Sequence, residues 1–190
     1  MYEYGSKEWE KEYKEIVEKR KEIIKQPYLF ITPEWCSNFE YLIQNDLRYK
    51  EVAKKWEGSV VLVIKTESES ILVDNFFLFL ELWHGECKYA KLVPENAGRN
   101  GDYVLEADYN RWRRILKGEL NVVKELATQN VKLMPFNFKK ALKLAAAAQA
   151  AVRLVFLASK VNSLFFEDLD SSQLDLFKSF RCELKSILGI

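Results

Sequence analysis

Residues Asp74–Val93 read DNFFLFLELWHGECKYAKLV, two apolar runs on either side of the turn His84-Gly85-Glu86. Runs this short and this apolar, separated by a glycine turn, are typical of two buried strands that form a hairpin. Because side chains alternate between the faces of a strand, a solvent-facing Glu81 sets the phase of the first run. Its own face then carries Phe77, Phe79 and Trp83, and the opposite face carries Phe76, Leu78, Leu80 and Leu82. Both faces are apolar, so we expect helices to cover one of them. A second layer, a subunit partner or an apolar ligand would cover the other.

The overall composition narrows the class of protein. The 190 residues suffice for one domain with a substantial core, and the 29 basic and 28 acidic residues nearly balance. A dedicated nucleic-acid binder usually has a basic excess, so we expect no nucleic-acid partner. No apolar run approaches the roughly 20 residues that cross a bilayer, and the N-terminus lacks the apolar core of a signal peptide. The widely spaced Cys36, Cys87 and Cys182 are typical of free thiols in a reducing compartment, with one disulfide left open. These features predict a cytoplasmic protein.

Three further segments are expected to be strands, namely Ser59–Lys65, Asp102–Ala107 and Val131–Met134. Thr66–Leu72 is expected to be a polar turn, and Pro94–Gly101 (PENAGRNG) to be a loop. Strands that are joined by short turns pair in the antiparallel sense. The pattern therefore predicts an α+β domain, with helices on one face of a mainly antiparallel sheet.

Helix signals surround these strands. Ser6 is the expected cap of a helix that runs to about Gln26, and Thr32 followed by Pro33 begins another. Between them, Tyr28–Ile31 is expected to be a short apolar connection. The remaining helices are expected from Asn45 or Asp46 to Gly58, over Tyr109–Lys117 with Asp108 as the cap, over Leu120–Ala127, from Phe138 to about Val161, and near Ser171–Leu188.

The segment Asn45–Lys160 resembles the sterol carrier protein (type 2) lipid-transfer domain family. The resemblance rests on an ordered series of motifs: KWEG at 55–58, VVLVIK at 60–65, HG at 84–85, CKYAKLV at 87–93, DYVLEAD at 102–108, WRRI at 112–115, LKGEL at 116–120, VKL at 131–133 and KALKL at 140–144. Members of the family usually place glycine on both sides of the last strand, where this chain has Gln129 or Asn130 and then Pro135.

The resemblance implies a five-stranded sheet covered by helices, with an apolar tunnel between them for a fatty-acyl, sterol-like or similar lipid. It implies lipid transfer or presentation without covalent chemistry and without a cofactor. A transient contact with a membrane and a homodimer are compatible with that activity. Residues 1–44 form an N-terminal helical extension outside the resemblance, and residues 161–190 form a C-terminal helical tail packed on the same domain.

Ten apolar residues of this domain are candidates for the tunnel wall. They are Leu78, Leu80, Leu82, Trp112, Ile115, Leu116, Val123, Leu133, Leu144 and Ala148. The competing interpretation is that each of them is an ordinary core residue. The alanine run at 145–151 either lets a helix pack closely or leaves room beside it, and close packing is the commoner outcome.

A polar headgroup would need different residues. Arg111 and Arg114 lie near Trp112 on one helix and could bind an anionic headgroup, although a solvated face beside Glu106, Asp108 and Glu119 is the simpler expectation. Glu106 could orient a headgroup if its strand turned it inward, where burial would raise the pKa of its carboxyl group. An outward Glu106 is the simpler expectation.

Signals for catalysis or metal binding are weak. His84 and Cys87 have a metal-like spacing, but a zinc site needs three or four ligands, so we expect no metal. The same two residues have no third group to orient them as a nucleophile and its base. We therefore expect a lipid carrier that is not an enzyme. The alternative from a different class is a non-catalytic interaction or dimerisation module with the same fold and a filled tunnel.

Overall fold

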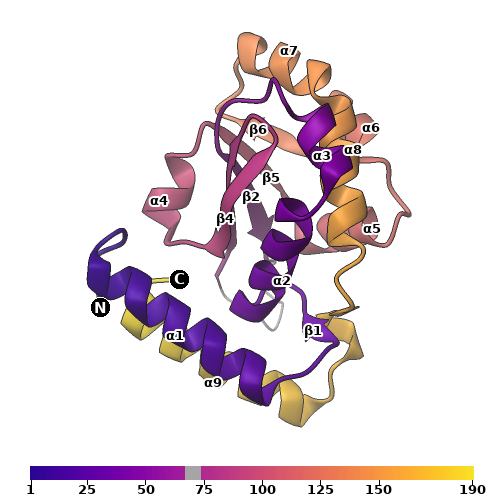
Figure 1. The fold of residues 1–190 in the computed structure, drawn as a ribbon. Helices are drawn as coiled ribbons and strands as arrows, with labels where there is room; N and C mark the ends of the chain where they lie inside the picture. The colour runs from indigo at the N-terminus through magenta and orange to yellow at the C-terminus, as the bar shows by residue number, and fades with distance from the viewer. Residues whose placement is uncertain (67–73) are drawn as a thin grey trace.

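The computed structural model describes residues 1–66 and 74–190 (Figure 1). Within these residues, the main sheet consists of β2 (Val60–Lys65), β3 (Phe76–Trp83), β4 (Glu86–Leu92), β5 (Tyr103–Asp108) and β6 (Lys132–Met134). The strand order is β4-β3-β2-β5-β6, and each neighbouring pair is antiparallel except β2 and β5, which are parallel. The α+β class and the mainly antiparallel sheet are confirmed, and the parallel central pair makes the sheet mixed. The turn expected at Thr66–Leu72 lies almost wholly outside the described residues.

The parallel pair arises from the connection between β4 and β5. Sequence predicts a loop at Pro94–Gly101, but this segment contains a short helix, α4 (Glu95–Arg99), which packs on β3 and β2. A Cβ atom at Gly98 would lie 2.6 Å from Cδ1 of Phe77, so glycine permits this close contact between α4 and the sheet. The connection thereby crosses the sheet and returns the chain beside β2.

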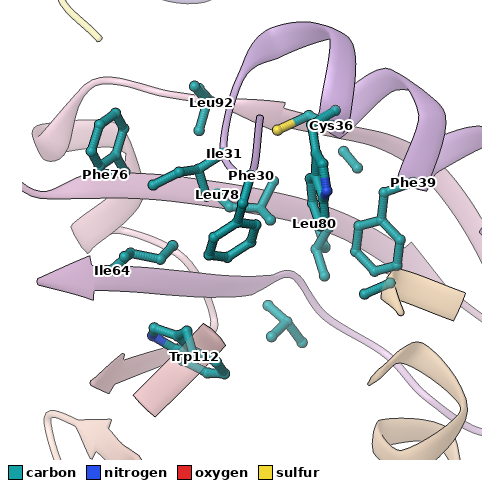
Figure 2. Packing of buried hydrophobic residues seen from close by; sticks show 14 of the residues in the cluster. Phe30, Ile31, Cys36, Phe39, Ile64, Phe76, Leu78, Leu80, Leu92 and Trp112 are labelled. Carbon is teal, nitrogen blue, oxygen red and sulfur yellow. The ribbon is translucent and has the colours of Figure 1, made fainter. Parts of the chain in front are cut away.

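The predicted phase of β3 is confirmed. Phe76, Leu78, Leu80 and Leu82 belong to the main core, whereas Phe77 and Phe79 belong to a small cluster on the opposite face. Ala97 of α4 and Tyr4 near the N-terminus pack against that second cluster. The second apolar face is therefore covered by the chain itself. Figure 2 shows Phe76, Leu78 and Leu80 within the main core, among side chains from other elements.

Helices cover the main core. They are α2 (Pro33–Gln44), α3 (Leu47–Val52), α5 (Tyr109–Leu116), α6 (Val122–Ala127), α7 (Phe138–Ala146) and α8 (Ala148–Ala158). Asp46 and Asp108 cap α3 and α5 by accepting hydrogen bonds from the backbone N–H groups of Tyr49 and Arg111, as their positions predict. Thr32 differs: its hydroxyl donates to the backbone oxygen of Leu29 at 2.8 Å and makes no cap bond.

The prediction of one long helix from Phe138 to Val161 is wrong. The chain breaks at Ala147, where ψ is 16°, and α7 and α8 are bent by 68°. The break falls inside an alanine run, which offers no large side chains to hold one straight helix against the layer. α8 packs on α2, α3, α5 and α6, whereas α7 lies at the end of the layer (Figure 1) with no buried residue. Among the described helices, none is long and apolar enough by itself to cross a membrane; α7 and α8 together match such a segment in length and composition only.

The N-terminal and C-terminal segments pack against each other. Helices α1 (Lys7–Ile23) and α9 (Ser171–Leu188) lie side by side (Figure 1), and the short strands β1 (Tyr28–Leu29) and β7 (Ser163–Leu164) form a parallel pair. A 3₁₀ turn, η1 (Phe166–Asp168), precedes α9. The expected irregular connection at Tyr28–Ile31 thus contains a strand. The buried carboxylate of Glu34 accepts two hydrogen bonds of 2.7 Å from Arg20, which joins α1 to α2.

Candidate functional site

A cavity of about 90 Å³ lies between the sheet and the helices that cover its main core. The sheet contributes six of its lining residues: Val60, Leu62, Leu78, Leu80, Leu82 and Leu105. The opposite wall comes from α2, α5, α6, α7 and α8, and includes Phe39, Trp112 and Leu154. Figure 2 shows side chains of the sheet, α2 and α5 that face this region, among them Leu78, Phe39 and Trp112. The lining is almost entirely apolar.

The polar atoms of the tryptophans that line the cavity are already bonded to the protein. The indole N–H of Trp112 donates to the backbone oxygen of Val63 at 3.0 Å, and that of Trp56 donates to the oxygen of Gly58 at 2.8 Å. The indole N–H of Trp35 donates to Oγ of Ser163 at 2.8 Å. Because these donors have partners, the rings present only apolar surface to the cavity. Such a wall suits a hydrocarbon ligand and offers little to a polar one.

Small residues make the cavity possible. Ala147, Ala150, Ala151 and Ala158 line it from α8 and from the break that precedes α8. The alanine run therefore leaves space beside the helix in this structure, whereas close packing was the commoner expectation. A larger side chain at these positions would fill the volume.

Seven of the ten predicted wall residues line the cavity. They are Leu78, Leu80, Leu82, Trp112, Ile115, Leu116 and Leu144. The other three lie elsewhere. Ala148 lines a shallow outer groove with Val152 and Phe156, Leu133 is buried in β6 away from the cavity, and Val123 is half-buried on α6. Val122 and Leu126, which lie one turn apart on α6 (Val122–Ala127), supply the wall from this helix instead.

The ten wall residues predicted from the sequence do not include several residues that line the cavity. Phe30, Trp35 and Phe39 line the cavity but belong to the first 44 residues, outside the family resemblance. Trp35 and Phe39 form an apolar stripe on α2 at helical spacing, which is a signal for packing but not for packing against a cavity. Tyr49 of α3 also lines it, and burial raises the pKa of its hydroxyl well above the ordinary value, so this group is neutral.

The three predicted headgroup residues do not line the cavity. Arg111 pairs with the buried carboxylate of Glu125, and Arg114 pairs with Glu119 at 3.1 Å. Glu106 lies two residues from Val104 in β5 and shares its face of the sheet, opposite the main core. Its carboxylate pairs with Arg99 at 2.8 Å and with Lys65 at 3.5 Å.

The pKa of Glu106 agrees with this placement. Partial burial raises it, but the hydrogen bond from Arg99 and the charge of Lys65 outweigh burial, so that the net pKa is below the ordinary value. The structure thus agrees with the simpler expectation of an outward Glu106, which is ionised in an ion-pair network, and contradicts an inward, neutral Glu106 that orients a headgroup.

His84 and Cys87, the pair with a metal-like spacing, lie in different environments, since the thiol is buried and the imidazole is exposed. Burial raises the pKa of the Cys87 thiol to about 12, and Nε2 of His84 lies 2.8 Å from Oε1 of Glu57 at the surface. Among residues 1–66 and 74–190, no cluster of three or more His, Cys, Asp or Glu side chains could hold a metal ion.

Comparison with solved structures places this arrangement among known folds. A crystal structure of sterol carrier protein 2 is 30% identical, with a TM-score of 0.61, and the alignment covers 67% of this chain and 95% of that one. A solution structure of a conserved hypothetical protein from Thermus thermophilus, for which a sterol carrier identity is suggested, is 29% identical, with a TM-score of 0.63. That alignment covers 74% of this chain and 94% of the other. No protein-family model and no curated protein matches the sequence.

Proposed function

Because this chain belongs to the sterol carrier protein 2 family, we propose that it is a cytoplasmic lipid carrier that holds a fatty-acyl, sterol-like or other apolar ligand between its sheet and its helices. The observation that supports this most strongly is the apolar cavity at that position. Its wall contains alanines where larger residues would close it. Carriage of this kind needs no covalent chemistry and therefore no catalytic residue.

The volume of the cavity sets a condition on the ligand. The cavity of about 90 Å³ is several times the roughly 10–15 Å³ that admits one water molecule, but it is small beside ligand pockets of about 300–1,000 Å³. Burial of each methylene gains about 0.8 kcal/mol, and a short chain segment alone would bind weakly once the costs of association are included. We therefore expect the cavity to widen when a longer chain enters. The wall best suited to move is α7, which has no buried residue.

The small volume also favours a second candidate function. A cavity that stays narrow would suit a non-catalytic interaction or dimerisation module with the same fold. In that case the protein would act through its surface, and its mass in solution would report a stable homodimer. Lipid carriage has the stronger support, because a module that acts through its surface alone gains nothing from an apolar cavity.

Native mass spectrometry of the purified protein, followed by organic extraction and lipid analysis, tests the proposal directly. We expect a co-purified lipid, or displacement of a bound fluorescent fatty acid by an added lipid. A bare monomer mass with no binding of any tested lipid would contradict the carrier. A dimer mass under the same conditions, again without lipid, would support the interaction module.

A further inference from the structure

The charges of this chain are unevenly distributed. No acidic residue occurs between Glu125 and Glu167, whereas six basic residues do: Lys132, Lys139, Lys140, Lys143, Arg153 and Lys160. The formal charge of the whole chain is only +1, so the rest of the chain is net acidic. The basic stretch includes β6, α7 and α8. Three of the six, Lys139, Lys140 and Lys143, belong to α7, at the end of the helical layer.

The same stretch exposes large apolar side chains. Met134, Phe136, Phe138 and Leu142 are 41%, 59%, 68% and 56% exposed. Phe138 and Leu142 lie one turn apart on α7, and Lys139 and Lys143 lie one turn apart beside them. We refer to these six residues as the α7 face. Within the described residues, Lys139 and Lys143 form no ion pair.

Aromatic and aliphatic side chains flanked by lysines are the chemistry that an anionic lipid surface recognises. The apolar groups enter the boundary between headgroups and acyl chains, and the lysines contact anionic headgroups. Helix α1 offers a contrast, because its six basic and six acidic residues balance and two exposed lysines pair with glutamates, Lys11–Glu15 at 3.7 Å and Lys14–Glu18 at 3.8 Å. Its surface is therefore nearly neutral. The α7 face is the better match to a negatively charged bilayer.

Helix α7 also reaches the cavity. Leu144 and the adjoining Ala147 line the cavity wall, and Leu144 lies only two residues, about half a turn, from the exposed Leu142 on the opposite side of α7. Beside the α7 face, Lys139, Lys140 and Lys143 line an open groove, whose other lining residues include Glu57, Trp83, Asp102 and Tyr103. A bilayer seated on α7 would thus meet apolar and basic groups on the outer side of a helix whose inner side forms part of the cavity wall. We propose that the α7 face docks this protein on anionic membranes, an inference that rests on lipid carriage as its function.

Co-sedimentation of the full chain with lipid vesicles tests the docking surface. We expect binding to phosphatidylcholine vesicles that contain about one third phosphatidylglycerol to exceed binding to phosphatidylcholine alone by about tenfold. The double variants Phe138→Ser/Leu142→Ser and Lys139→Glu/Lys143→Glu should each lose about tenfold in vesicle affinity. Matched controls are Ile23→Ser/Leu176→Ser, which alters apolar residues that are 80% and 69% exposed, and Lys11→Glu/Lys14→Glu on α1. Both controls should bind like the wild type.

Two other results of the vesicle experiment would contradict docking by the α7 face. Equal vesicle binding by the wild type and both α7 variants, or equal loss in the controls, would overturn the α7 face. Binding of a single-stranded oligonucleotide that is lost in the lysine variant, without any vesicle binding, would assign the surface to nucleic acid and would also overturn the membrane proposal.

Displacement of a fluorescent fatty acid without vesicles separates this proposal from lipid carriage. The α7 variants should retain that binding, with circular dichroism confirming that they fold. Vesicle binding without any fatty-acid binding would support the docking surface and contradict carriage. Fatty-acid binding without vesicle binding would overturn the docking surface alone.

Discussion

The indole Nε1 of Trp9 donates a hydrogen bond of 2.9 Å to the backbone oxygen of Leu188. Trp9 also stacks on Tyr13, whose hydroxyl accepts a hydrogen bond from the backbone N–H of Leu92 in β4 at 3.1 Å. Helix α1 thus connects α9 to the sheet through a continuous set of buried contacts. The terminal helices are part of the structure that supports the cavity.

Replacement of Trp9 should therefore destabilise the whole protein. Trp9→Phe keeps most of the apolar contact but leaves a buried carbonyl without its partner, and should lower the free energy of unfolding by about 1–3 kcal/mol. Trp9→Ala should cost about 3–5 kcal/mol. Urea titration followed by circular dichroism measures both. The control, Trp83→Phe, alters a residue that is 44% exposed and should change little; an equal loss there would contradict a specific role for Trp9.

A phenylalanine at Ala151 should block the cavity. Ala151 lines it from α8, whereas Ala148 on the same helix faces an outer groove. Exclusion of about two methylenes of ligand would weaken binding by about tenfold. We expect Ala151→Phe to bind a fluorescent fatty acid about tenfold more weakly than the wild type, and Ala148→Phe to bind it normally. The same affinity for both variants would place the ligand elsewhere.

The Asp46–Arg153 pair should make stability depend on pH. Nε of Arg153 donates to Oδ1 of Asp46 at 2.9 Å, and this bond lowers the pKa of Asp46 below its ordinary value. A lowered carboxyl pKa in the folded state adds stability above the unfolded pKa of about 3.9, and that stability is lost as the pH falls through the folded pKa. Asp46→Asn should therefore be less stable than the wild type at neutral pH, and the difference should shrink below about pH 4. Urea midpoints across this range measure the effect; a constant difference would exclude the pair as its source.

The three thiols should differ in reactivity. Burial raises the pKa of Cys36 well above its ordinary value and that of Cys87 to about 12, whereas Cys182 is exposed. Since the thiolate is the reactive form, only Cys182 should be alkylated quickly by iodoacetamide at neutral pH. Peptide mapping by mass spectrometry locates the label, and Cys182→Ser should remove the fast reaction. Rapid labelling of Cys87 in the native protein would show that β4 opens readily.

Local features of the fold were predictable because local chemistry determines them. The strand limits followed from apolar runs and turn residues, the phase of β3 from Glu81, and the helix starts at Ser6, Asp46 and Asp108 from their capping side chains. Gln129 stands at one of the positions where members of the family usually have glycine. It adopts a φ of 60°, a backbone conformation that glycine tolerates more easily.

Features that depend on distant contacts were not predictable from these signals. The parallel pairing of β2 with β5 depends on where the connection through α4 crosses the sheet. The break at Ala147 has no proline or glycine to mark it, and it shifted Ala148 out of the cavity wall. Trp35 and Phe39 appear as an ordinary apolar stripe because unfilled volume leaves no trace in a sequence pattern.

The bond from Trp9 to Leu188 also bears on biosynthesis. The two residues are 179 positions apart, and a ribosome that adds about 5–20 residues per second completes the second roughly 10–40 s after the first. The hydrogen bond from the indole N–H of Trp35 to Ser163 likewise forms only after Ser163, 128 positions later, has been synthesised. During this interval the aromatic side chains of α1 and α2 lack their partners on the nascent chain. We expect this N-terminal segment to be the part of the protein that engages chaperones during translation.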